Sequence, residues 1–190
     1  VVLEGAWTTV GEVRSAATTG ALARLALPPD RVWLANTDTD SSVAAAWLSE
    51  QLRLARAGWA AVAGTVHLHD ATPRLAQQFS AAYPTNADGT HHHVHGANLG
   101  VRADAYLAAG GWPGLGLAED HALIDELRRR GEPVVSSTAV RVHTSARLTG
   151  RAENGFAATL CRLHAELPAG TPSPHGVCAP RVATAHHTDG

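Results

Sequence analysis

Residues 31–42 read Arg-Val-Trp-Leu-Ala-Asn-Thr-Asp-Thr-Asp-Ser-Ser, an apolar run followed directly by two aspartates that one residue separates. The apolar run at 31–35 predicts a short buried strand. Residues 43–57 predict a helix that Ser41 or Ser42 caps, since hydroxyl side chains favour the position just before a helix. The two aspartates therefore lie in a predicted strand-to-helix loop.

Strands and helices continue to alternate on both sides of this loop. Further strands are predicted at 59–69, 97–101 and 133–144, and further helices at 11–27, 73–82, 103–109, 119–130 and 155–167. Such alternation predicts an α/β fold with a mostly parallel sheet, in which functional groups gather at the carboxyl ends of the strands. We expect one domain over 1–167 and a flexible tail over 168–190.

Composition limits the classes of partner. The chain of 190 residues is 45% hydrophobic and 17% charged, which is typical of a globular protein that buries a core. Its net charge of -2 offers no basic field for a polyanion, so nucleic acid is not an expected partner. No apolar run approaches the roughly 20 residues of a membrane span, and no export signal is visible. We expect a cytoplasmic protein without a transmembrane segment, and the sequence leaves a homodimer open.

Two carboxylates in a loop after a buried strand suit a hard divalent cation. Asp38 and Asp40 can offer oxygen ligands to Mg²⁺ or Mn²⁺ while the ion also holds a substrate diphosphate. Taken alone, the pattern is weak, because acidic residues are also common in loops and helix caps.

Three segments in this order give the pattern more weight. They are Trp-Leu-Ala-Asn-Thr-Asp-Thr-Asp at 33–40, His-Gly-Ala-Asn-Leu-Gly-Val-Arg-Ala-Asp-Ala-Tyr-Leu-Ala-Ala-Gly-Gly-Trp at 95–112 and Glu-Asp-His-Ala-Leu-Ile-Asp-Glu-Leu at 119–127. Together they resemble the family 2 glycosyltransferases and their bacterial relatives, which have the Rossmann-like GT-A fold. The opening strand and nucleotide-gripping loop of that family have no counterpart before Val1, so we expect an N-terminally truncated GT-A domain.

The resemblance implies an activity and a set of site residues. It implies transfer of a hexose from a nucleoside-diphosphate sugar to an unknown acceptor, with Mg²⁺ or Mn²⁺ on the Asp-x-Asp loop. The expected catalytic base is Asp120, with Glu119 as the alternative base. The expected metal ligands are Asp40, Asp38 and His143. The residues expected to contact the donor or the acceptor are Asp38, Arg14, Gly96, Asn98, Trp112, Arg147 and Arg151. A histidine at a place similar to His143 occurs in the related glucosyl-3-phosphoglycerate synthases, which retain configuration and would need no such base.

Other interpretations stay open. Nucleotidyl transfer also uses paired carboxylates on a metal, and an inactive truncated transferase or a metal-binding domain built on His91, His92 and His93 is a third alternative. Adjacent histidines point in divergent directions, so the interpretation as a histidine-based metal-binding domain is weaker. Glu119 and Asp120 could simply favour a helix start, and Trp112 could serve packing alone.

Overall fold

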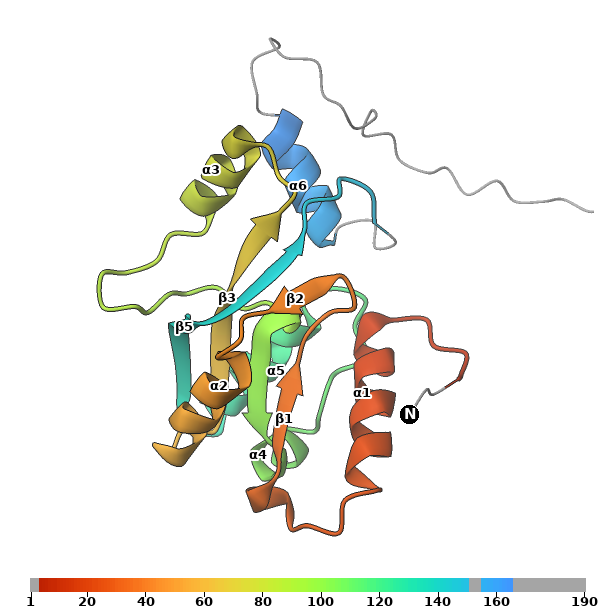
Figure 1. Ribbon diagram of the computed structural model, residues 1–190. Helices are drawn as coiled ribbons and strands as arrows, with labels where there is room; N and C mark the ends of the chain where they lie inside the picture. The colour runs from red at the N-terminus through yellow and green to blue at the C-terminus, as the bar shows by residue number, and fades with distance from the viewer. Residues whose placement is uncertain (1–3, 151–154, 166–190) are drawn as a thin grey trace, which may run out of the picture. The chain divides into compact units, whose positions relative to one another are not determined.

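A mixed sheet with helices around it makes up most of the described chain (Figure 1). The computed structural model describes residues 4–150 and 155–165, and the predicted tail lies outside them. The strands are β1 (Trp33–Asn36), β2 (Ser41–Val43), β3 (Ala61–His69), β4 (Leu99–Arg102) and β5 (Val134–Ser145). The helices are α1 (Val10–Leu22), α2 (Trp47–Arg56), α3 (Pro73–Ala82), α4 (Ala103–Ala108), α5 (Glu119–Arg129) and α6 (Phe156–Ala165), with short 3₁₀ turns η1 (Pro29–Arg31) and η2 (Gly96–Asn98). The chain divides into two compact units, Val1–Ala146 with the sheet and Arg147–Gly190 with α6.

The α/β class agrees with the sequence, but the expected mostly parallel pairing does not. Within the described residues the strand order is β1-β4-β3-β5-β2, and only β3 and β5 pair in parallel. The chain leaves β3 at its carboxyl end and reaches β4 without a crossover back to the other edge, so β4 has to run antiparallel. Since β1, β3 and β5 still share one direction, their carboxyl ends meet at the same edge.

The aspartate loop joins two strands, which corrects the predicted strand-to-helix loop. Residues Ser41–Val43 form β2 against the end of β5, with the Ser41 hydroxyl 3.0 Å from that of Thr144. The helix begins only at Trp47, and no side chain caps it. Pairing with the open edge of β5 satisfies backbone groups of the segment, and this tertiary contact overrides the capping tendency of the serines.

Helices cover the two faces of the sheet differently. Leu99 and Val101 of β4 belong to a buried cluster with Leu123, Ile124 and Leu127 of α5. Because side chains alternate along a strand, the intervening Gly100 faces the opposite side, where a Cβ would meet Gln51 of α2 and Trp33 of β1. The missing side chain makes room for the hydrogen bond from Trp33 Nε1 to Gln51 Oε1, 2.8 Å long.

Asn98 bridges an irregularity between β3 and β5. Gly64 lies opposite Ser137 but Thr65 lies opposite Arg141, so residues 138–140 bulge out of β5. The Asn98 amide nitrogen donates to the carbonyl oxygens of Thr65 and Val140 at 2.8 and 2.9 Å, and its oxygen accepts from Trp47 Nε1 at 2.8 Å. The side chain is fully buried, and these bonds replace ladder bonds that the bulge removes.

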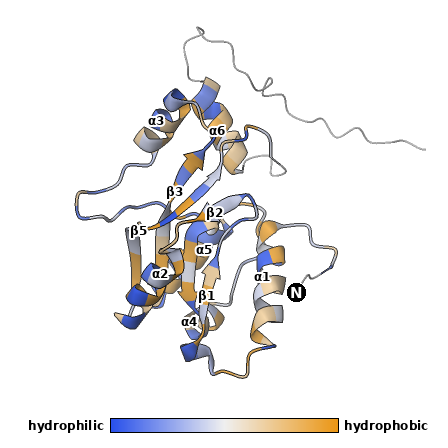
Figure 2. Ribbon diagram, in the orientation of Figure 1, coloured by the Kyte–Doolittle hydropathy of each residue, from blue (hydrophilic) through white to orange (hydrophobic). Residues whose placement is uncertain are grey.

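α1 carries apolar side chains that stay exposed. Figure 2 shows this helix mostly in the orange and tan of hydrophobic residues, and Val10 and Val13 are among the exposed large hydrophobic side chains. A capping box of Thr9 and Glu12 starts the helix. Among the described residues, the structure contains no helix that is both long enough and apolar enough to span a membrane.

The close fit around Asn98 gives a stability prediction. A Cβ at Gly64 would lie 2.2 Å from the Asn98 amide nitrogen and 2.5 Å from the Val140 carbonyl oxygen. Gly64→Ala should therefore lower the free energy of unfolding by about 1–3 kcal/mol, the usual cost of overpacking. Urea denaturation measures the change. Gly116→Ala is the control, since no atom lies within 4 Å of its added Cβ, and an equal loss in both variants would contradict the assignment.

Candidate functional site

The aspartate loop is fixed at the carboxyl end of β1. The Asn36 amide donates to the Leu99 carbonyl oxygen at 3.2 Å, which ties the end of β1 to β4. A turn follows, in which the Ser41 backbone nitrogen donates to the Asp38 carbonyl oxygen at 3.1 Å. Asp38 and Asp40 are each partly exposed between these two anchors. Their carboxylates therefore sit at the edge where the strands of common direction end.

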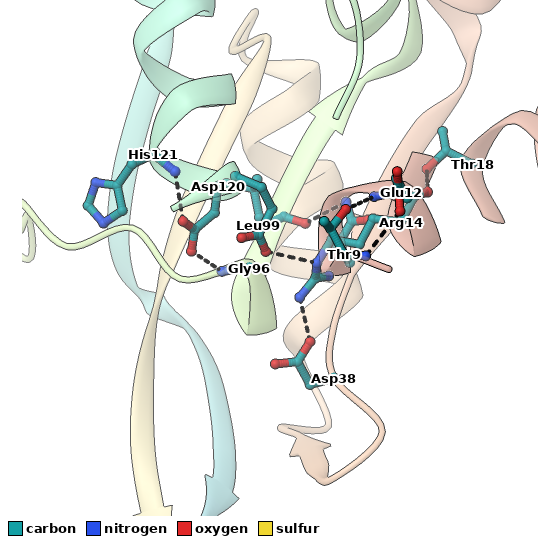
Figure 3. Close-up of polar contacts among 11 residues, drawn as sticks. Thr9, Glu12, Arg14, Thr18, Asp38, Gly96, Leu99, Asp120 and His121 are labelled. Carbon is teal, nitrogen blue, oxygen red and sulfur yellow. Dashed lines mark hydrogen bonds and ion pairs between the residues drawn. The ribbon is translucent and has the colours of Figure 1, made fainter. Parts of the chain in front are cut away.

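Arg14 links this loop to the start of α5 (Figure 3). Its Nη2 donates to Asp38 Oδ1 at 2.5 Å, and its Nε lies 3.3 Å from Glu119 Oε1. The guanidinium also lies over the Trp112 ring, 5.2 Å from the ring centre, where the electron-rich face attracts a cation. The Arg14 and Glu119 side chains are only 13% and 10% exposed, so water screens this pair little, whereas Asp38 is 41% exposed and its pair is screened more.

Glu119 carries its charge in a poorly hydrated place. Its side chain is 10% exposed, and burial is the main cause that raises its pKa above the usual 4.5. The neighbouring carboxylates of Asp120 and Asp38 raise the pKa further, while Arg14 opposes them. A carboxyl group with a raised pKa beside charged partners is typical of functional sites, although structural ion pairs also produce it.

Asp120 faces the backbone of the next segment. Its Oδ2 accepts from the Gly96 nitrogen at 2.7 Å and its Oδ1 from the His121 nitrogen at 2.8 Å (Figure 3). A Cβ at Gly96 would come within 2.7 Å of Arg14 Nη2, so any other residue here would displace the guanidinium. The helix is entered through Ala118, whose φ of 60° is unusual for a residue other than glycine. This entry sends Glu119 toward Arg14 and Asp120 toward Gly96.

Most of the residues expected from the sequence meet in one place. Arg14, Asp38, Gly96, Trp112, Glu119 and Asp120 form this group, which we call the Arg14 cluster. Trp112 is 4% exposed and packs in the core, so its ring contacts Arg14 but does not line an open pocket.

Two other expected residues of the sheet unit, Asn98 and His143, lie outside this cluster. The Asn98 amide, expected to contact a ligand, is instead fully buried and holds β3 and β5 in place. His143 pairs in register with Ser42, and its ring lies 5.4 Å from that of His67. Arg147 belongs to the second compact unit, and Arg151 lies outside the described residues.

A divalent cation would find carboxylates here but no complete protein cage. In the part of the chain that the structure describes, no group of three or more His, Cys, Asp or Glu side chains is arranged to hold a metal ion. Magnesium sites that serve phosphate substrates commonly use only one or two carboxylates and complete the shell with phosphate and water. Arg14 engages only Oδ1 of Asp38, whose side chain is 41% exposed. The Asp38 carboxylate, which Arg14 engages through one oxygen, therefore meets the minimum that such a site requires.

A cavity of about 290 Å³ adjoins the cluster and was not foreseen from the sequence. Four histidines line it, together with aromatic and hydroxyl side chains from β3 and α3. They are His67, His93, His95 and His143. None of the carboxylates of the Arg14 cluster lines it, but His95 is followed directly by Gly96. Burial lowers the pKa of His95 to about 4, while the charge of Asp120 opposes this shift.

The signal for the cavity lies in the spacing of the histidines. Adjacent residues of an extended segment point apart, but residues two apart point to the same side. His91 and His93 stack with ring centres 5.4 Å apart, and those of His93 and His95 lie 6.3 Å apart. Of these three residues, His93 and His95 line the cavity, so their alternate spacing indicates it better than the adjacent run at 91–93 does.

The environment of Glu119 predicts a pH effect on stability. The folded protein holds this proton more tightly than the unfolded chain, so the free energy of unfolding falls as pH rises from about 4.5 through the raised pKa. Glu119→Gln lacks this loss, and its stability relative to the wild type should increase over the same range. Denaturation at a series of pH values tests this. The exposed Glu4→Gln is the control, and a constant difference for Glu119→Gln would contradict the prediction.

No protein-family model matches the chain, and no curated protein is similar to it in sequence. The resemblance to family 2 glycosyltransferases therefore stays a prediction that depends on three short segments. What the chain does has to be inferred from the arrangement of its own residues, above all the Arg14 cluster and the cavity beside it.

Proposed function

We propose that the chain is a metal-dependent glycosyltransferase of the GT-A type, which transfers a hexose from a nucleoside-diphosphate sugar. The observation that carries this proposal is the Arg14 cluster. It brings the Asp-x-Asp loop and the Glu119-Asp120 helix start together from segments far apart in the chain. The resemblance had assigned complementary roles to these same two segments.

The charges of the cluster support a metal-assisted donor site. One guanidinium pairs with the carboxylates of Asp38 and Glu119, and the charge of Asp120 acts on Glu119 as well, so a donor diphosphate would need further positive charge to approach. A divalent cation on Asp38 and Asp40 would supply that charge and neutralise the leaving diphosphate. Arg14 can donate charge-assisted hydrogen bonds to the same phosphates while its Nε remains paired with the Glu119 carboxylate.

Asp120 is the residue that we assign as base. Its carboxylate is partly exposed, whereas Glu119 is buried against Arg14. Each Asp120 oxygen accepts one backbone N–H, which fixes the group and still leaves a lone pair on each oxygen. In an inverting transfer this carboxylate takes the proton of the acceptor hydroxyl as the hydroxyl attacks the anomeric carbon.

The donor site is tested by calorimetry with UDP-glucose and GDP-mannose, with and without Mn²⁺. We expect binding to one of them that requires the ion and weakens at least tenfold in Asp40→Asn, a loss of roughly 1.4 kcal/mol. Asp88→Asn, in an exposed loop, is the control and should bind as the wild type does. Failure of both nucleotide sugars to bind would contradict the proposal, and release of pyrophosphate from a nucleoside triphosphate would indicate nucleotidyl transfer.

The base is tested by the slow hydrolysis of whichever donor binds. Asp120→Asn should keep donor affinity but lower the rate of nucleoside-diphosphate release by about 10²–10⁴, the usual contribution of general acid–base catalysis. Asp125→Asn on the same helix is the control, since that side chain is 72% exposed and pairs only with Arg128. An unchanged rate in Asp120→Asn would exclude the base role and favour a retaining reaction.

A further inference from the structure

The cavity beside the Arg14 cluster differs from it in charge. Among the residues that the structure describes, its lining contains no Asp, Glu, Lys or Arg side chain. Arg141 is near enough for its charge to lower the pKa of His67, but its Nε donates to the Thr138 carbonyl oxygen and it does not line the cavity. Burial is the main cause that lowers the pKa of both His67 and His95, which favours the neutral form of these two imidazoles. The described lining therefore offers a ligand no carboxylate, ammonium or guanidinium group.

The lining combines hydrogen-bonding groups with an aromatic wall. Hydroxyl side chains (Thr65, Ser80) and imidazole rings form part of the lining. His93 Nε2 donates to the Pro84 carbonyl oxygen at 2.7 Å, which fixes the ring so that Nδ1 of the neutral form is an acceptor. Tyr83 lies 4.6 Å from Phe79 between ring centres and offers an apolar surface. Such a wall suits the C–H face of a pyranose, and the polar groups suit its hydroxyls.

The position of the cavity connects it to the proposed reaction. His95 lines the cavity, and the nitrogen of the next residue, Gly96, bonds to Asp120. The charge of Asp120 also opposes the lowering of the His95 pKa, which agrees with their neighbouring positions. The part of the cavity beside His95 is therefore the part nearest to the proposed base along the chain.

We propose that this cavity is the acceptor site and that it takes an uncharged sugar or polyol ring rather than a phosphorylated or carboxylated acceptor. The inference rests on the proposed transferase function and adds the acceptor class to it. Moving a phosphate into this lining would remove its hydration without providing a cation, which is costly. A neutral ring loses only hydroxyl hydration, which the imidazoles and hydroxyls replace.

The test compares glucose with glucose 6-phosphate, which share one ring and differ by the phosphate. Protein labelled at its histidines is titrated with each sugar at pH 7.5, without donor or metal, and the imidazole signals are followed by NMR. We expect saturable shifts of the cavity histidines with glucose and at least tenfold weaker binding of glucose 6-phosphate. Ala76→Leu, which adds volume to the cavity lining, should weaken glucose binding at least tenfold, whereas Gln77→Leu on the exposed side of α3 should not.

Each outcome decides the proposal. Equal or tighter binding of glucose 6-phosphate to the wild type, or no saturable effect of glucose, would overturn it without reference to any variant. Unchanged glucose affinity in Ala76→Leu, with thermal unfolding as the check that the variant folds, would also overturn it. Donor binding to the Arg14 cluster is measured separately, so loss of the acceptor assignment and loss of the transferase proposal are distinguishable.

Discussion

The contact of Arg14 with two carboxylates from distant segments is the constraint on which the site depends. The carboxylates of Asp38 and Glu119 would repel each other, and the Arg14 guanidinium that contacts both offsets that repulsion. Arg14 in turn depends on the position of α1. The Gly11 nitrogen donates to the Leu115 carbonyl oxygen at 3.1 Å, and a Cβ at this glycine would collide with the Pro113 carbonyl oxygen. The helix, the loop before α5 and the aspartate loop are therefore held as one arrangement.

Two chemically different regions share one edge of the sheet. The Arg14 cluster is rich in charge, whereas the described lining of the adjoining cavity contains no Asp, Glu, Lys or Arg. The segment from His95 to Gly96 connects the two, because the His95 side chain lines the cavity and the Gly96 nitrogen bonds to Asp120. In the proposed transferase, this arrangement would place an anionic donor and an uncharged acceptor in different surroundings.

The sequence anticipated the order of most elements and the members of the Arg14 cluster. Apolar periodicity and acidic residues at a helix start are local signals, so the strand before Asp38 and the helix from Glu119 could be predicted well. The direction of each strand could not be predicted, because this direction depends on where the chain re-enters the sheet. The role of Asn98 also escaped prediction, since the carbonyl groups that it satisfies become unpaired only through the bulge in β5. The run of adjacent histidines at 91–93 obscures the alternate spacing by which the rings of His91, His93 and His95 stack on one side of the segment.

The bulge filled by Asn98 also has a consequence for how the chain folds. Parallel pairing of β3 and β5 is already a non-local event, and the amide that stabilises their shifted register is 33 residues from Thr65 and 42 from Val140. Non-local contacts form slowly, because the entropy of closing long loops must be overcome before the contacts stabilise anything. We expect the carboxyl-terminal halves of these strands, which carry His67 and His143, to become ordered together with the segment 96–98. We therefore expect the cavity to be among the last parts of the molecule to form during refolding.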